Sequence, residues 1–292
     1  EILRCLVGSE MCIRDSYDLL SHLYGMSNDH PSPNAMNPSD LSIDSLVTAL
    51  PPITLEEMKS IRLMNRTDQK YLANVETLKK LLRAVQGLYY AQEVDGLRIS
   101  PYATTYWDDA SRGMYYSHQT GHVPRTKVRV RTYLSSHQTF LEVKNKDNHG
   151  KTFKSRVSVP SLDAVIEQGA GGDFLQEVTG LRLDSLVPTL SNRFSRITLV
   201  NYEKTERLTI DFNIHFYNHV TQAQQLMDNI VVIELKRDGR VPSPILPILR
   251  ELRIKPAGFS KYCIGATVTN PHLRINRFKK RLIRIRKVAE SR

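Results

Sequence analysis

The chain has 292 residues, of which 40% are hydrophobic, so it is long and apolar enough for a globular fold and is not a wholly disordered protein. No apolar run approaches the roughly 20 residues that a membrane-spanning helix needs. The formal net charge is +11, but eight Lys and Arg and no acid lie between Arg274 and Lys287, so the charge alone does not indicate a nucleic-acid binder.

The N-terminal part reads as a lead-in to the fold. Residues 1–16 look like translated adaptor sequence, and residues 27–40 are rich in Ser, Asn, Asp and Pro, which predicts disorder. We therefore expect a lead-in over residues 1–52, a main domain over residues 53–270 and a basic tail over residues 271–292. The three cysteines show no disulfide or metal-binding spacing, which favours a reducing compartment and a cytoplasmic location.

The main domain begins with a predicted helix and continues mostly as strands. Asn74 is a suitable N-cap for a helix through about Gln86, whose apolar residues recur on one side. Strand-like segments follow at residues 102–107, 127–133, 139–146, 152–159, 194–200, 207–214 and 230–236. Residues 161–187 predict short helices with a glycine-rich break. This order predicts an α+β, mainly β fold built on an antiparallel barrel or sandwich.

Several of these strands place charge on one face and apolar residues on the other. Arg129 and Arg131 alternate with valines, and Glu142, Lys144 and the following strand continue the pattern. Side chains two positions apart on a strand share a face, so the pattern predicts a barrel or deep trough lined with positive charge, which suits a polyanion. An ordinary solvated face with cross-strand surface pairs is the alternative interpretation.

Glu234 stands out because it lies in the apolar strand sequence Ile230-Val231-Val232-Ile233-Glu234-Leu235. A carboxylate in so apolar a strand needs a partner, because an unpaired buried charge costs several kcal/mol. From the strand alone, a metal ion and a salt bridge remain equally open.

A series of short segments, taken in order, carries a resemblance to a known family. The segments are Arg66-Thr67-Asp68-Gln69-Lys70-Tyr71, Thr105-Tyr106-Trp107-Asp108, Arg125-Thr126-Lys127-Val128-Arg129-Val130-Arg131, Leu141-Glu142-Val143-Lys144, Lys154-Ser155-Arg156, Arg207-Leu208-Thr209-Ile210-Asp211, Ile233-Glu234-Leu235-Lys236 and Phe259-Ser260-Lys261-Tyr262. Together they resemble the polyphosphate polymerase domain of the VTC (vacuolar transporter chaperone) family, within the triphosphate tunnel, CYTH-like superfamily. The similarity spans Ile53 to about Thr267.

The resemblance implies an antiparallel β-barrel tunnel in which the γ-phosphate of ATP passes to a growing polyphosphate chain, a phosphotransferase reaction. It implies that Lys70 lies at the transferred phosphate with the catalytic pair Arg129 and Arg131, and that Glu234 binds a divalent metal, Mn²⁺ or Mg²⁺. The implied phosphate-binding residues are Lys144, Lys154, Arg196, Arg207, Ser260 and Lys261. Glu142 and Asp211 are expected to orient these basic groups.

One departure bears on the activity. Triphosphatase branches of the superfamily begin with a Glu-x-Glu-x-Lys strand, whereas residues 66–70 here hold a single acid. This favours the polymerase branch and leaves the metal to be held largely by phosphate oxygens and water. An inorganic or nucleoside triphosphatase using the same tunnel is the alternative activity, and a non-catalytic polyanion-binding module is the alternative outside enzymes.

The basic tail repeats apolar residues at helical spacing, at Ile275, Phe278, Leu282 and Ile285. This predicts a helix that either lies on an anionic membrane surface, a membrane protein or polyphosphate, or packs its apolar stripe on the domain. No RNA-binding motif accompanies it, so we expect no specific nucleic-acid partner.

Overall fold

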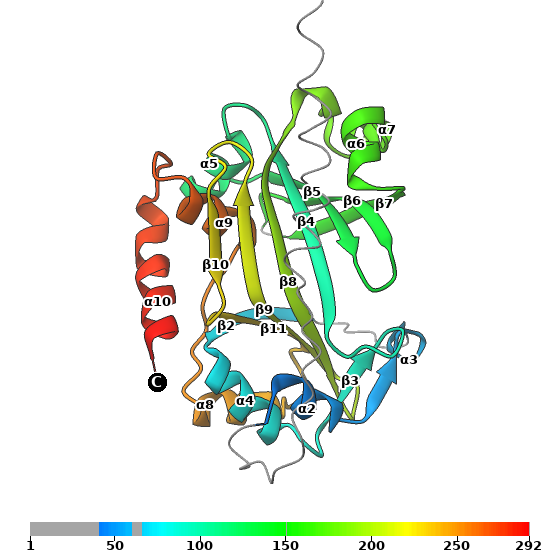
Figure 1. Ribbon diagram of the computed structural model, residues 1–292, viewed down its shortest axis with the longest axis vertical. Helices are drawn as coiled ribbons and strands as arrows, with labels where there is room; N and C mark the ends of the chain where they lie inside the picture. Colours follow the sequence, from blue (N-terminus) through cyan, green and yellow to red (C-terminus); the bar gives the residue numbers. More distant parts are fainter. Residues whose placement is uncertain (1–40, 60–65, 150, 292) are drawn as a thin grey trace, which may run out of the picture. The chain divides into compact units, whose positions relative to one another are not determined.

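The computed structural model describes residues 41–59, 66–149 and 151–291. The expectations for residues 1–40 lie outside this range. Ser42–Arg292 form one compact unit, which is mainly β with short helices around the sheet (Figure 1). The proposed boundaries at residues 52 and 270 stay predictions.

The described residues form an 11-stranded sheet, ordered β2-β11-β9-β8-β4-β5-β6-β7, with β10 beside β9 and β3 linking β1 to β8. The strands are β1 Pro52–Thr54, β2 Arg66–Ala73, β3 Tyr89–Glu93, β4 Ser100–Asp108, β5 Arg125–Tyr133, β6 Gln138–Lys146, β7 Thr152–Val159, β8 Val187–Asn201, β9 Glu206–Asn218, β10 Gln224–Met227 and β11 Val231–Asp238. Within the described chain, only the short β1–β3 pair is parallel. The predicted strands correspond to β4–β9 and β11, whereas β1, β2, β3 and β10 were not predicted.

The helices are short. They are α2 Ile43–Thr48, α3 Leu55–Lys59, α4 Val75–Ala84, α5 Gly113–Thr120, α6 Leu162–Gln168, α7 Gly172–Thr179, α8 Ile245–Glu251, α9 Lys261–Thr269 and α10 Lys279–Glu290, with single 3₁₀ turns η2 Leu183–Ser185 and η3 Asn276–Phe278. The predicted cap of α4 is confirmed, because the Asn74 side chain accepts a hydrogen bond from the Thr77 amide at 2.8 Å. The predicted short helices between β7 and β8 are α6 and α7.

The apolar core lies on both faces of the sheet. On one face of β5 and β6, Val128, Val130 and Leu141 pack beneath α6 and α7. On the other face, at one end, α9 lies against β8 and β9. Gly265 makes this approach possible, since a Cβ there would lie 2.4 Å from the ring of Phe216. The apolar cluster around α9 covers only this end of the face, and charged side chains line the part that it leaves uncovered.

The sheet curls but its ends, β2 and β7, are not paired with each other in the described chain. Residues 255–260, the closing segment, instead cover the free edge of β2. The Ala257 amide donates to the Lys70 carbonyl at 2.8 Å, and Pro256 bridges to Tyr71. The curl brings β6 near β2 and β11. The charges of Glu234 and Lys70 on those two strands consequently act on the Lys144 ammonium of β6. The predicted antiparallel tunnel fold is confirmed, in the form of an open, curled sheet.

The C-terminal helix α10 packs its apolar stripe on the domain. Phe278 and Ile285 are buried in the cluster that contains α9, and Leu282 packs against it. Figure 1 shows α10, in red, beside β10. The expectation of a membrane contact through this stripe is not supported, because the stripe is already covered. No helix of the described chain has the length and hydrophobicity to cross a membrane.

Candidate functional site

Strand register brings the predicted cations onto one face of the curled sheet, which we call the tunnel face. Lys70 lies opposite Glu234, Arg129 opposite Glu142, and Lys144 opposite Lys154. Neighbouring pairs continue the face across the remaining strands, with Glu234 opposite Thr209, Lys236 opposite Arg207, Arg196 opposite Asp211, and Thr104 opposite Arg131. Opposed residues in register share a face, so cations from β2, β5, β6, β7, β8, β9 and β11 line one concave surface.

Glu142 is the centre of one buried charge group. Its carboxylate accepts hydrogen bonds from Arg129, at 2.6 Å and 2.7 Å, and from the Lys154 ammonium. Burial would raise the pKa of this carboxyl, but Arg129, Arg131 and Lys154 lower it to about 2. Glu142 therefore stays ionised and holds Arg129 and Lys154 in fixed positions on the tunnel face.

Asp211 is the centre of a second group. Arg196 donates to both of its carboxylate oxygens, at 2.6 Å and 2.8 Å, and Lys261 forms an ion pair with it. Burial would raise the pKa of Asp211, but Arg196 and Lys261 hold it far below its ordinary value. The bidentate geometry fixes the guanidinium plane of Arg196 on the tunnel face.

Aromatic rings on the tunnel face lie against the same cations. The ring of Phe194 lies 4.1 Å from the Lys261 ammonium, and the ring of Tyr102 lies 5.0 Å from the Arg196 guanidinium. The two rings stack on each other with centroids 5.2 Å apart. Such cation–π contacts stabilise a desolvated cation without neutralising it.

Lys70 and Glu234 form the third charge group, with Nζ and Oε1 2.8 Å apart. Burial would raise the pKa of Glu234, but Lys70 and Lys236 lower it to about 2. The Glu234 side chain keeps 21% of its surface exposed, so this carboxylate is more open to solvent than Glu142 and Asp211, at 2% and 5%.

A divalent metal fits this site only if the substrate supplies most of its ligands. The described residues contain no group of three His, Cys, Asp or Glu side chains that could hold a metal. Glu142 and Asp211 are each bound by two cations, whereas Glu234 is half-buried and pairs with Lys70 at the more exposed site. One carboxylate with phosphate oxygens and water is a normal ligand set for Mg²⁺.

The remaining predicted residues also lie on or beside the tunnel face. The Ser260 hydroxyl caps α9 and accepts a hydrogen bond from the Lys127 ammonium at 3.2 Å. Arg131 donates to the Thr104 hydroxyl at 3.1 Å, and burial, then Arg129 and Arg196, lower its pKa to about 10. Every cation named by the sequence is therefore part of one connected surface.

Sequence reasoning assigned no role to Lys127 or Asp68 on this face, and it gave Arg156 only as part of the charged alternation. Lys127 precedes Arg129 by two residues, so the alternation that identified the two arginines already contained it. Arg156 lies opposite Glu142 and over the ring of Phe140, 4.4 Å from its centroid. Asp68 lies opposite Lys236, and the polar residues around it in the sequence give no alternation that would indicate its face.

Asp108 anchors the helix that carries Ser260 and Lys261. This fully buried carboxylate accepts hydrogen bonds from the amides of Met114 and Tyr115, each at 2.9 Å, and from the Tyr262 hydroxyl. It thereby ties the start of α5 to the first turn of α9. The position of Lys261 beside Asp211 depends on this connection, so Asp108 has a structural role.

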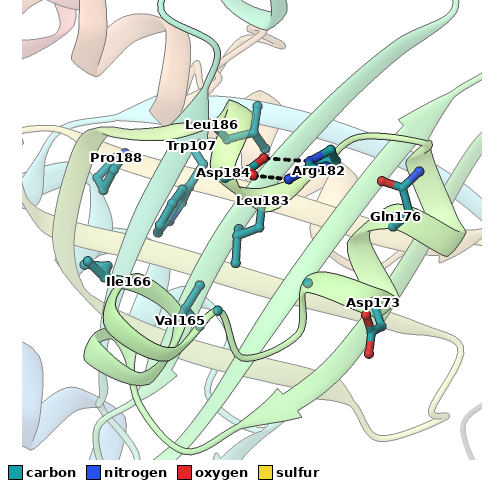
Figure 2. Close-up of a pocket in the computed structure, with 12 residues that line it drawn as sticks. Trp107, Val165, Ile166, Asp173, Gln176, Arg182, Leu183, Asp184, Leu186 and Pro188 are labelled. Atoms are coloured by element: carbon teal, nitrogen blue, oxygen red, sulfur yellow. Dashed lines mark hydrogen bonds and ion pairs between the residues drawn. The ribbon is translucent and has the colours of Figure 1, made fainter.

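A separate cavity of about 520 Å³ lies on the opposite face of β4. Figure 2 shows Trp107 and residues around α6, α7 and η2 lining it, with the Arg182–Asp184 ion pair at its edge. Trp107 and Tyr106 are adjacent on β4 and point to opposite faces. The cavity therefore does not belong to the tunnel face.

One family model and several solved structures are similar to this chain. The sequence model of the family described as VTC domain matches residues 65–270. A search of curated proteins gives no significant match. Among solved structures, a Hippeastrum protein described as a candidate adenylyl cyclase with dominant triphosphatase activity has 15% identity and a TM-score of 0.45, covering 71% of this chain and 97% of its own.

Two further structures are similar at the same level. A Bacillus halodurans protein described as a candidate adenylate cyclase has 15% identity and a TM-score of 0.43, covering 74% of this chain and 100% of its own. A Pyrococcus horikoshii protein has 13% identity and a TM-score of 0.39, covering 69% and 98%. Similarity at this level carries no inference about activity.

Proposed function

The chain belongs to the VTC domain family, and from this membership together with the tunnel face we propose that it is a metal-dependent polyphosphate polymerase that uses ATP. The γ-phosphate passes to the end of a polyphosphate chain and ADP is released. The proposed partners are accordingly ATP and polyphosphate, and the proposed location is the cytoplasm, where ATP is available.

The observation that carries the proposal is the distribution of cations around one concave face. Arg129, Lys144 and Arg196 come from three different strands, and Lys261 comes from a helix on top of the face. A linear triphosphate presents oxygens along its whole length, so it is held best by donors that surround it. Buried carboxylates fix the arginines in advance, which lowers the cost of ordering them around a substrate.

Transfer of a phosphoryl group requires positioning and charge neutralisation rather than covalent help from the protein. The terminal oxygen of the polymer attacks the γ-phosphorus, and the bond from that phosphorus to the β–γ bridging oxygen breaks. Arg129 and Arg131 hold the triphosphate in line, and Lys70 neutralises the charge that develops on the transferred group. A metal held by Glu234 would neutralise the β- and γ-phosphate oxygens when bound.

The test is synthesis of polymer by the purified full chain with ATP and Mn²⁺, followed on a gel stained for polyphosphate. We expect a ladder of chains from the wild type and at least a roughly 100-fold lower rate from Lys70→Ala, the size of loss typical for a group that stabilises transition-state charge. Lys80→Ala is the matched control, since this exposed lysine of α4 lies outside the tunnel face.

A triphosphatase is the second candidate, and Asp68 is the observation that favours it. This exposed carboxylate lies on the tunnel face of β2, two residues before Lys70 and opposite Lys236. It could orient a water molecule where the polymerase admits a polymer end. Release of phosphate without polymer would replace the polymerase proposal by this one, and binding of polyphosphate without turnover would leave a polyanion-binding module.

A further inference from the structure

One end of the tunnel face carries four cations on three elements, which we call the basic end. Arg125 and Lys127 lie on β5, Lys146 lies opposite Arg125 on β6, and Arg281 comes from α10. Lys127 precedes Arg129 by two residues, a distance of about 7 Å along a strand. The basic end therefore continues the line of cations that begins with Arg131 and Arg129.

Contacts with the closing segment place Arg281 at this end. Its guanidinium lies against Gly258, with Cζ 3.6 Å from the position that a Cβ would take there. Gly258 is two residues before Ser260, whose hydroxyl receives the hydrogen bond from Lys127. Arg281 is also held over the ring of Phe278, 5.4 Å from its centroid. In Figure 1, α5, α9 and the start of α10 gather at the same corner of the sheet.

No carboxylate of the described residues balances the basic end, whereas several cations further along the tunnel face are paired with acids. Arg129, Lys154, Arg196, Lys261 and Lys70 all form ion pairs with acids. Within the described chain, none of the four cations of the basic end has a carboxylate within ion-pair distance.

The groups behind the basic end are neutral and add no negative charge. The Cys263 thiol lies 3.1 Å from Nδ1 of His118. Burial, then the charges of Lys127, Arg125, Arg281 and Lys146, lower the pKa of His118 to about 3. Burial likewise raises the pKa of the Cys263 thiol. Three half-buried positive charges and an exposed fourth, none with a carboxylate partner in the described chain, are stabilised best by an anionic ligand.

We propose that Arg125, Lys127, Lys146 and Arg281 form a subsite that holds the inorganic polyphosphate chain beyond the phosphates at Arg129 and Arg131. This inference rests on the proposed function. A triphosphate held at Lys70, Arg129 and Arg131 lies where cations are paired with acids, and a longer chain extends from there toward the basic end. The basic helix α10 thereby contributes Arg281 to the polyphosphate-binding subsite.

The test is equilibrium binding of two ligands, tripolyphosphate and a long polyphosphate of defined length, to the full chain without metal. Arg281→Gln and Lys146→Gln are expected to weaken long-chain affinity by about three- to tenfold each, the loss of one partly screened charge contact. Tripolyphosphate affinity stays unchanged in both. The slope of log affinity against log salt for the long chain falls by roughly one per variant, which a merely structural change does not produce.

Arg286→Gln is the matched control, because this residue is exposed on the same helix. It is expected to change neither affinity. Equal weakening of both ligands, or no weakening of the long chain, would overturn the subsite while leaving the proposed function intact. If the wild type binds neither ligand, both the subsite and the proposed function fail. The use of two variants on α10 and β6 separates a charge effect from displacement of the closing segment.

Discussion

The Lys70 ammonium lies 2.8 Å from the Glu234 carboxylate across the β2–β11 pair. The lysine that we assign to the transferred phosphate and the carboxylate that we assign to the metal therefore hold each other before substrate binds. Binding of a metal–triphosphate complex exchanges this pair for two new ones, Lys70 with phosphate and Glu234 with metal.

The exchange predicts opposite effects of Glu234→Gln with and without metal. Without metal, loss of a negative charge from the tunnel face raises tripolyphosphate affinity by about three- to tenfold. With Mn²⁺, the turnover of ATP falls by at least roughly 100-fold. Calorimetry in the presence of a chelator and a turnover assay measure the two effects. Glu76→Gln, on the outer helix α4, is the control, and a fall in metal-free affinity would contradict the exchange.

Glu142 predicts a loss of stability in acid. Its folded pKa of about 2 lies below the ordinary value of 4.5, so its stabilising contribution is present above about pH 4.5 and is lost as the pH falls through about 2. This difference corresponds to about 3 kcal/mol of folding free energy. Glu142→Gln should remove a similar amount at pH 7 in urea unfolding, and Glu177→Gln, an exposed residue of α7, should not. An unchanged midpoint in the Glu142 variant would contradict the prediction.

Lys127 predicts that anion binding weakens in mild alkali. Burial, followed by the charges of Lys144 and Arg125, lowers its pKa from 10.5 to about 8. Polyphosphate affinity should then fall by roughly tenfold between about pH 8 and 9.5, because one linked proton is lost. Stability should change in the opposite direction, since the folded state loses this proton first and gains stability between about pH 8 and 10.5. Lys261 has a pKa that burial also lowers to about 8, so Lys127→Arg should make the fall in affinity shallower rather than abolish it. An equally steep fall in that variant would rule out Lys127 as a titrating group.

The contacts of Arg284 predict that α10 helps to position α9, the helix that carries Lys261. Its guanidinium donates to the carbonyls of Pro256 and, at 2.8 Å, Lys255 in the closing segment, which leads directly into Ser260 and Lys261. Arg284→Gln should lower the affinity for tripolyphosphate by about three- to tenfold while costing only about 1–2 kcal/mol of stability. Titration and thermal unfolding measure the two, with Arg286→Gln as the control. Loss of stability with unchanged affinity would show that Arg284 only supports the fold.

The close packing at Gly265 predicts that no larger residue fits where α9 meets β8 and β9. A methyl group there would lie 2.4 Å from the Phe216 ring and 2.6 Å from the Leu190 side chain, both fully buried. Gly265→Ala should lower stability by about 2 kcal/mol, the usual cost of overpacking a core. Gly172→Ala is the matched control, since its nearest atom is at 3.9 Å and it should be neutral within about 1 kcal/mol in thermal unfolding. Equal melting temperatures for both variants would contradict the close approach.

The strands that sequence predicted well are those with one apolar and one charged face. β5, β6 and β7 have this alternation in their central residues, and their predicted bounds agree with the structure within two residues. β2 was missed because residues 66–70 are all polar, although Lys70 in it carries the proposed chemistry. β10 was missed for the same reason, since Gln224 and Gln225 show no apolar alternation.

The basic residues of the site could be named from sequence, but their balance by acids could not. The pairing of Arg196 with Asp211 depends on the β8–β9 register, which shifts between Arg193 and Ser195. The second cation on Asp211, Lys261, arrives from a helix fifty residues further along. Such contacts follow from how the sheet curls and where α9 packs, and a local sequence pattern contains neither.

The order of the chain has a consequence for how the tunnel face forms during synthesis. The β5–β6–β7 hairpins join neighbouring residues and can pair as soon as they are made, whereas β2 must wait for β11 on one edge and for the closing segment on the other. Until those distant parts emerge, Lys70 has no partner strand. The set of cations that surrounds a triphosphate is therefore complete only after the closing segment has been made.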